Sequence, residues 1–285
     1  MKLVRFGARD AERPGLLDAD GRVRDLSAWI ADFNPQCLAD WICMEQLKTL
    51  DPSQLPLISQ TTRLGPCLDR IGKVICIGFN SRLHTRQMGM TPLKNGHMVV
   101  FLKPSSAVCG PNDPILYTRN TKKLDWEAEL GIVIGKKGKY IRKKEAKEHI
   151  LGYLCVNDLS DRYLQLETGD TQYTKAKGFD NAAPIGPYLV TRDDIADSNQ
   201  LQIKLWVNGV LRQNFNTRDY LHNDVAIVSY VSQYFTLYPG DVISMGSAPG
   251  TAKSLGEEAY LKPNDRVVLA ISGLGQQEQV VCIES

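Results

Sequence analysis

The sequence lacks several features that would assign it to a particular class of protein. Its seven cysteines are odd in number and none form a Cys-x-x-Cys pair, so we expect reduced thiols rather than a disulfide framework. No apolar run approaches the roughly 18 residues that span a bilayer. The first residues, 1–7, contain no apolar signal core. We therefore expect a cytoplasmic protein with no membrane partner.

An excess of charge of one sign is also missing. The 285 residues include 34 Lys and Arg against 32 Asp and Glu, a formal net charge of +2, which gives no reason to expect a nucleic-acid partner. The basic run at 135–147 is interpreted as an exposed turn and helix start. A phosphate loop is excluded at 131–136, because Lys137 stands where Ser or Thr is needed.

What the sequence does contain is a pair of glutamates at the start of an apolar, β-branched run. Glu127 and Glu129 precede residues 131–135, whose composition is typical of a strand, so both side chains should point to one face. Two carboxylates this close repel each other unless a cation lies between them. Asp158, at the end of a second apolar strand, adds a third oxygen ligand. This set favours Mg²⁺, with Mn²⁺ or Ca²⁺ as alternatives, over Zn²⁺.

Polar residues suited to catalysis occur near these acids in the sequence. Arg162 and Gln165 would share one face of a helical turn and can donate to carboxylate or carbonyl oxygens. Lys177 precedes a glycine and could stabilise an enolate. His84 follows a buried strand and could act as general base for water. Glycines and a hydroxyl residue at 246–251 predict an anion-binding loop.

Taken together, these segments resemble the fumarylacetoacetate hydrolase superfamily. Within it, the chain is most similar to bacterial acylpyruvate hydrolases, ureidoglycolate lyases and 2,4-diketo-3-deoxy sugar acid hydrolases. Each short motif is weak alone, but the set occurs in the family's order over roughly residues 70 to 270. The matching segments are 75–84, 101–106, 125–135, 152–165, 177–180, 184–187, 207–209 and 237–250.

The resemblance implies roles for matching positions. Glu127, Glu129 and Asp158 would hold a divalent metal. Lys177 would lie beside the metal-bound substrate, and His84 would activate water. The remaining expected contacts with substrate are Arg162, Gln165, Ser247 and, on the wall of the site, Lys103.

The chain departs from the family pattern at several positions. Family hydrolases usually pair the histidine with a glutamate three residues later, but here that position is Gln87. A neutral amide can orient an imidazole but stabilises its charged form less. Ser81 stands where a tyrosine is common, and Ser247-Ala248 replaces a more usual Thr-Pro. The metal ligands therefore match the pattern better than the hydrolytic machinery does.

The fold class that we expect is α+β and rich in β structure. The resemblance implies a mixed β-sheet roll with short helices over 70–285, preceded by a small α/β appendage and connector at 1–65. The pattern predicts a hairpin at Asp20-Gly21 and helices near 37–50, 143–149 and 222–235. The resemblance also implies a homodimer.

Three functions remain open at this stage. The first is a metal-dependent hydrolase that cleaves a C–C bond of a 2,4-dioxo acid, giving pyruvate and a carboxylic acid. The second is a decarboxylase of a 2-oxo diacid such as oxaloacetate, or a keto–enol tautomerase, using the same metal site. The third is a catalytically degenerate binding protein. We expect the loops at 81–96 and 161–174 to determine the substrate's side chain.

Overall fold

The structure, a computed structural model, describes residues 1–87, 96–170 and 172–284. Two large sheets dominate it, and the expected β-rich α+β fold is confirmed. None of the helices in the described part of the chain is long and apolar enough to cross a membrane.

The larger sheet has nine strands and is mixed. Its strands pair antiparallel except β16 and β4, which run parallel. In spatial order they are β3 (Val23–Asp25), β2 (Arg13–Leu17), β1 (Lys2–Phe6), β13 (Leu189–Thr191), β10 (Ile150–Asn157), β9 (Ala128–Ile134), β16 (Val242–Ser244), β4 (Val74–Gly78) and β5 (Val99–Lys103).

The second sheet has five strands, and two short pairs complete the β structure. The five-stranded sheet runs β15 (Val210–Asn216), β14 (Gln202–Val207), β17 (Arg266–Ile271), β18 (Gly275–Ile283) and β7 (Ile115–Tyr117). The short pairs are β11 (Ser160–Asp161) with β8 (Leu124–Asp125), and β12 (Ala183–Pro184) with β6 (Val108–Cys109).

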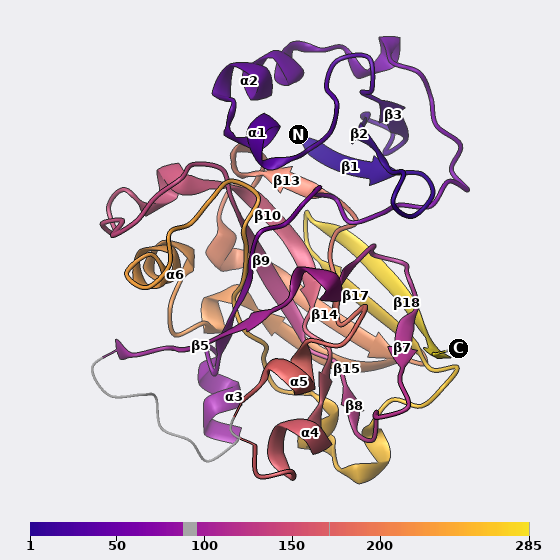
Figure 1. Cartoon of the computed structure of the whole chain (residues 1–285), viewed down its shortest axis with the longest axis vertical. Helices are drawn as coiled ribbons and strands as arrows, with labels where there is room; N and C mark the ends of the chain where they lie inside the picture. The colour runs from indigo at the N-terminus through magenta and orange to yellow at the C-terminus, as the bar shows by residue number, and fades with distance from the viewer. Residues whose placement is uncertain (88–95, 171, 285) are drawn as a thin grey trace.

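Short helices cover the two ends of the larger sheet. Figure 1 shows α1 and α2 with β1–β3 at one end, and α3, α4 and α5 at the opposite end. The α-helices are α1 (Pro35–Ala39), α2 (Trp41–Thr49), α3 (Arg82–Gln87), α4 (Arg162–Leu166), α5 (Thr174–Lys177), α6 (Asp224–Val231) and α7 (Ala252–Leu255). The 3-10 turns are η1 (Pro52–Gln54), η3 (Ser105–Ala107), η4 (Ala146–His149), η5 (Arg192–Asp194), η6 (Ser198–Gln200), η7 (Thr217–Asp219) and η8 (Glu257–Ala259).

The expected hairpin and two of the three expected helices are found, the helices with different bounds. The hairpin at Asp20-Gly21 joins β2 to β3. The helix expected at 37–50 is divided into α1 and α2, because Asp40 ends the first and caps the second through its side chain. The helix expected at 222–235 is α6, with Asn223 as its cap. At 143–149 only the turn η4 forms.

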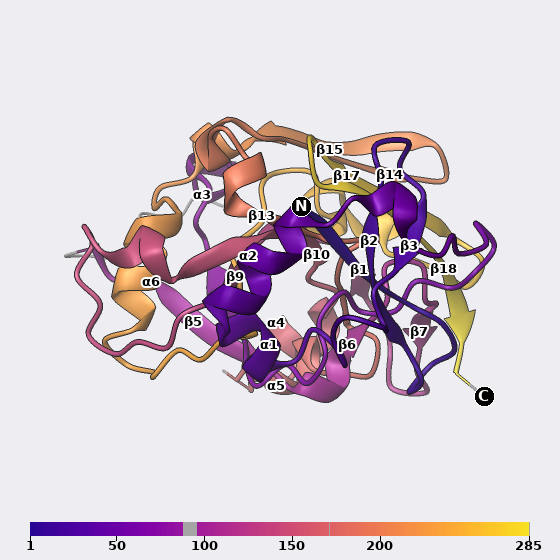
Figure 2. The same cartoon turned by 90° about the horizontal axis from the view of Figure 1, so that it is seen from above.

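Alternation along the central strands divides the core in two. On β4, Ile75 and Ile77 face a cluster shared with the five-stranded sheet, whereas Val74 and Cys76 face a cluster shared with the N-terminal segment. Figure 2 shows the two sheets in separate layers, with α1 and α2 on the side away from β14 and β15. The larger sheet is therefore buried on both faces, which explains its continuous apolar strands.

The expected boundary between 1–65 and 70–285 stays a prediction. In the structure, β1 pairs with β13, so the N-terminal strands extend the larger sheet. Leu3 and Val74 also belong to the same apolar cluster.

Candidate metal centre

Antiparallel pairing of β9 with β10 brings the three predicted acids together. Glu129 lies opposite Val156 in the register, and the backbone N–H of Asp158 donates to the carbonyl of Glu127 over 2.9 Å. One carboxylate oxygen from each acid lies within 4.8 Å of the others. All three side chains are buried. The period of two that places both glutamates on one face is the one expected from sequence.

Cationic side chains surround two of the three carboxylates. The ammonium of Lys177 donates to Glu127 Oε2 over 2.5 Å and to Asp158 Oδ2 over 2.6 Å. Lys103 donates to Asp158 Oδ1 over 2.5 Å. Arg162 lies 3.0 Å from Glu127 Oε1. Burial alone would raise the pKa of Glu127, but Arg162 and Lys177 together hold that pKa well below its usual range.

Glu129 differs because, among the described residues, no ammonium or guanidinium lies within ion-pair distance of it. Its Oε2 accepts from Ser244 Oγ over 2.6 Å and from the Gly246 N–H over 2.8 Å. Burial, followed by the negative charges of Asp158 and Glu127, raises the pKa of Glu129 to about 8. No side chain among the described residues gives this carboxyl a positively charged partner, so a bound metal ion would take that place.

These residues fit a hard divalent cation. The ligand atoms are all carboxylate oxygens, as Mg²⁺, Mn²⁺ and Ca²⁺ prefer. The raised pKa of Glu129 is the observation of this structure that supports the fit, since a cation between the acids would remove the repulsion. Glu127, Glu129 and Asp158 would hold it.

We expect metal binding to release a proton. Because the pKa of Glu129 is about 8 in the metal-free fold, its carboxyl carries a proton at lower pH that the metal must displace. Measured affinity should rise about tenfold per pH unit up to a pH of about 8 and level off above it. Calorimetry at pH 7 in buffers of different ionisation enthalpy measures the released proton; a heat that is independent of the buffer would contradict the protonated carboxyl.

Glycine is required where β16 ends beside the acids. Gly246 has a φ of +98°, and an added Cβ would lie 2.7 Å from the carbonyl oxygen of Ile77. Its N–H is directed to Glu129. The predicted anion-binding loop at 246–251 therefore uses this N–H for a protein carboxylate.

Glu127, Glu129 and Asp158 line a small hollow, and His84 lines it as well. It lies on α3, which follows β4, and the side chain of Asn80 fixes the turn between them through the carbonyls of Met245 and His222. The imidazole is buried, and its Nδ1 has no hydrogen-bond partner among the described residues. Burial lowers the pKa of His84, which keeps the ring neutral near neutral pH. Gln87 ends α3, but its side chain lies outside what the structure describes.

Arg162 and Gln165 lie together as their spacing predicts. On α4, Arg162 Nη1 donates to Gln165 Oε1 over 2.8 Å, and Arg162 Nε donates to Asp125 Oδ2 over 2.7 Å. Both side chains line the hollow. The guanidinium therefore links Asp125 to Glu127 and holds the strand that bears the acids.

The two other predicted contacts occupy different places. Ser247 lines the hollow, and its Oγ accepts from Gln213 Nε2 over 2.9 Å. Lys103 is not among the lining residues; its ammonium contacts Asp158 and, over 3.0 Å, the carbonyl oxygen of Leu159. The structure thus places Lys103 against a ligand residue.

Sequence reasoning missed several lining residues. Phe101 packs edge-on against Tyr173 with ring centroids 5.4 Å apart, and the Lys177 ammonium lies 5.0 Å from the Phe101 ring centroid. Thr251 and Lys253 also line the hollow. Phe101, Tyr173 and Thr251 stood within segments chosen from sequence but were not singled out, whereas Lys253 lies beyond the loop glycines and carries no motif.

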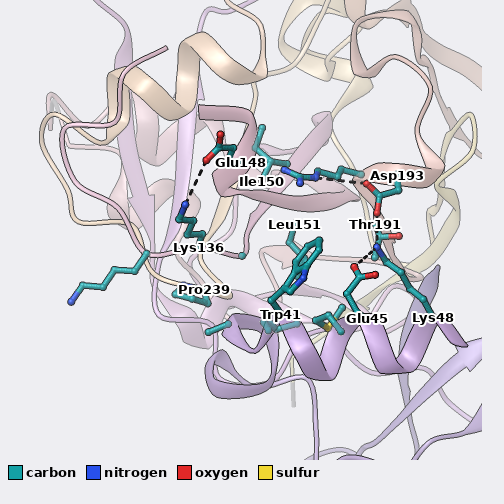
Figure 3. A pocket seen from close by; sticks show the side chains of 16 residues that line it. Trp41, Glu45, Lys48, Lys136, Glu148, Ile150, Leu151, Thr191, Asp193 and Pro239 are labelled. Atoms are coloured by element: carbon teal, nitrogen blue, oxygen red, sulfur yellow. Dashed lines mark hydrogen bonds and ion pairs between the residues drawn. The ribbon is translucent and has the colours of Figure 1, made fainter. Parts of the chain in front are cut away.

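A larger hollow lies at the other end of β9. It has a volume of about 560 Å³, against about 60 Å³ for the acidic hollow, and Gly135 lines it. Figure 3 shows Trp41 of α2 beside Leu151, with Lys136 paired to Glu148 and Lys48 paired to Asp193. None of the three predicted ligands lines it. Size alone would not select the acidic hollow, but the grouped acids and cations identify it as the candidate site.

Comparison with known proteins decides the family. Residues 73–282 match the family described as fumarylacetoacetate (FAA) hydrolase C-terminal. The chain belongs to the fumarylacetoacetate hydrolase family. A Burkholderia multivorans protein, named only as a hydrolase, is 44% identical over 281 residues, which are 98% of both chains.

Solved structures of this family cover the whole chain. Maleylpyruvate hydrolase from Sphingobium sp. SYK-6, in complex with manganese(II) ion and pyruvate, matches with a TM-score of 0.83 at 26% identity and full coverage of both chains. A 2-hydroxyhepta-2,4-diene-1,7-dioate isomerase from Mycobacterium marinum matches with a TM-score of 0.74 at 28% identity, covering 100% of this chain and 99% of that one. Family members are thus hydrolases and isomerases.

Proposed function

We propose that the protein is a divalent-metal-dependent hydrolase of 2,4-dioxo acids, closest in activity to acylpyruvate hydrolases. The observation that carries the proposal is the buried group of Glu127, Glu129 and Asp158, with Lys177 and His84 lining the same hollow. The hydrolase neighbour with manganese and pyruvate supports it. The products would be pyruvate and a carboxylic acid.

The bound metal would act as a Lewis acid and as a template for the 2-oxo acid end of the substrate. Lys177 supplies a fixed positive charge next to that end. Its ammonium is buried and held by Glu127 and Asp158, so it need not reorganise when negative charge develops on the substrate. Burial would lower the pKa of Lys177, but the carboxylates of Asp158 and Glu127 raise it, so the group stays charged.

Water would be activated by His84. The neutral imidazole takes a proton as the water oxygen bonds to the C4 carbonyl carbon of the substrate. The C3–C4 bond then breaks, its electron pair remains on C3, and a proton completes the methyl group of pyruvate. The acyl part leaves as a carboxylic acid.

One observation favours a second candidate. The imidazole Nδ1 of His84 is buried without a hydrogen-bond partner among the described residues, and the sequence offers Gln87 rather than a glutamate three residues on. A histidine without an acidic partner is a weaker base for water. Decarboxylation of a 2-oxo diacid or keto–enol tautomerisation needs the acids and Lys177 but no attacking water.

We expect the metal-stripped protein to be inactive and to release pyruvate from acylpyruvates once Mg²⁺ or Mn²⁺ is added. The physical reason is that, without a metal ion, the three protein carboxylates repel the carboxylate and the 2-oxo oxygen of the substrate. A panel of acylpyruvates, diketo-deoxy sugar acids and oxaloacetate, with every co-product identified, measures this. If oxaloacetate alone is converted, to pyruvate and CO₂, the protein is a decarboxylase rather than a hydrolase. If no compound of the panel gives a product, both functions are contradicted.

A further inference from the structure

Two polar groups in the acidic hollow lack partners within the protein. Thr251 is 1% exposed, and its Oγ1 has no hydrogen-bond partner among the described residues. Lys253 is half-buried, and no hydrogen bond or ion pair involves its ammonium in the described part of the chain. Both side chains line the hollow with His84 and Arg162. A buried hydroxyl without a partner carries a desolvation cost that a ligand can remove.

The neighbouring carboxylates are already engaged. Asp125 accepts from Arg162 and from the backbone N–H groups of Ala252, over 2.6 Å, and Lys253, over 3.2 Å. Glu127 is held by Lys177 and Arg162. The ammonium of Lys253 is thus left without a counter-ion among the described residues.

The charge balance around Lys253 agrees with this geometry. Burial lowers the pKa of Lys253, and the nearby positive charge of Arg162 lowers it further. The carboxylates of Glu127 and Asp125 raise it, but Arg162 holds both of them and Lys177 also pairs with Glu127.

The two groups are also held at a fixed place relative to the acids. Asp125 precedes Glu127 by two residues and accepts the Ala252 N–H at the first residue of α7. The start of α7 is thereby tied by hydrogen bonds to the segment that bears the acids.

We propose that Thr251 and Lys253 form a subsite for a carboxylate at the far end of the substrate. The inference rests on the proposed function, which places the 2-oxo acid end of the substrate at Glu127, Glu129 and Asp158. The substrate is then a 2,4-dioxo diacid. For the seven-carbon member, 2,4-dioxoheptanedioate and one water give pyruvate and succinate.

Binding of uncleavable probes tests the subsite without turnover. The probes are 2-oxoheptanedioate and 2-oxoheptanoate, which have the same chain length and lack the 4-oxo group. Calorimetry on the Mn²⁺-loaded protein should show the diacid binding at least about tenfold more tightly, as one charge-assisted hydrogen bond requires. In Lys253→Met that preference should disappear while the monoacid binds as before. Equal affinities in the unaltered protein would overturn the subsite.

Two further variants separate binding from folding. Lys262→Met changes an exposed lysine whose ion pair, with exposed Glu258, is 3.5 Å long, and should keep the full preference. Thr251→Val removes the hydroxyl at nearly constant shape; diacid affinity should fall about threefold or more, and the melting temperature without ligand should not fall. A lower melting temperature together with unchanged diacid affinity would show that the Thr251 hydroxyl is structural.

Turnover distinguishes the subsite from the proposed function. The matched substrates are 2,4-dioxoheptanedioate and 2,4-dioxoheptanoate, and Lys253→Met should lower kcat/KM only for the first, by about tenfold or more. If both are cleaved equally by the unaltered protein and by Lys253→Met, the hydrolase stands and the subsite fails. If neither is cleaved but the probes still discriminate, the subsite stands and the hydrolase fails.

Discussion

Replacing Glu129 by glutamine should lower metal affinity about 100-fold or more and turnover about 1000-fold. The amide oxygen of the new side chain can still accept from Ser244 and Gly246, so the loop keeps its support. What is lost is the carboxylate without a cationic partner among the described residues. Calorimetric titration of Mg²⁺ or Mn²⁺, combined with pyruvate release at saturating metal, measures both effects.

The same exchange at an exposed glutamate provides the control. Glu148 lies in η4 at the other end of the larger sheet and, among the described residues, pairs only with exposed Lys136, at 3.5 Å. Glu148→Gln should bind metal and turn over substrate as the unaltered protein does. If Glu129→Gln shows metal-dependent turnover close to that of this control, Glu129 is not a metal ligand.

Lys177→Met should separate metal binding from catalysis. Without the ammonium, turnover should fall about 100- to 1000-fold, as for loss of one preorganised donor at a developing negative charge. Metal affinity should not fall, because Glu127 and Asp158 lose a competing cation. The metal-free variant should lose about 3 to 5 kcal/mol of unfolding free energy, the cost of leaving buried charges unpaired. Added metal should restore much of that loss.

Thermal melts with and without metal, together with kcat measured separately from KM, test this prediction. Lys175→Met is the matched control, because Lys175 lies two residues earlier and its ammonium pairs, at 2.7 Å, with Asp170 at the surface. Loss of metal binding in Lys177→Met would show instead that the ammonium is needed to assemble the site.

The regular part of the fold could be predicted because alternation and turn residues act locally. The buried strand expected before His84 and the turn at Asp20-Gly21 correspond to observed elements. The split between α1 and α2 was missed because a single aspartate both ends and caps a helix there. The pairing of β1 with β13 joins residues nearly 190 apart, and no local pattern encodes it.

In the candidate site, too, local patterns could be predicted from sequence and long-range contacts could not. Glu127 and Glu129 could be placed on one face because a strand has a period of two. The pairing of Lys103 with Asp158 could not be predicted, since it depends on how β5 packs across the chain. Lys253 could not be predicted for a related reason. It is distinguished by having no ion-pair partner among the described residues, and the sequence does not show which carboxylates are already paired with other cations.

The N-terminal strands have a consequence for any shortened form of this protein. Because β1 occupies the open side of β13, removing residues before the expected boundary would uncover a row of unpaired backbone groups. It would also bare the apolar face that Leu3 and Val74 now share. The N-terminal strands thus prevent edge-to-edge aggregation at β13, and residues 70–285 are best expressed together with residues 1–65.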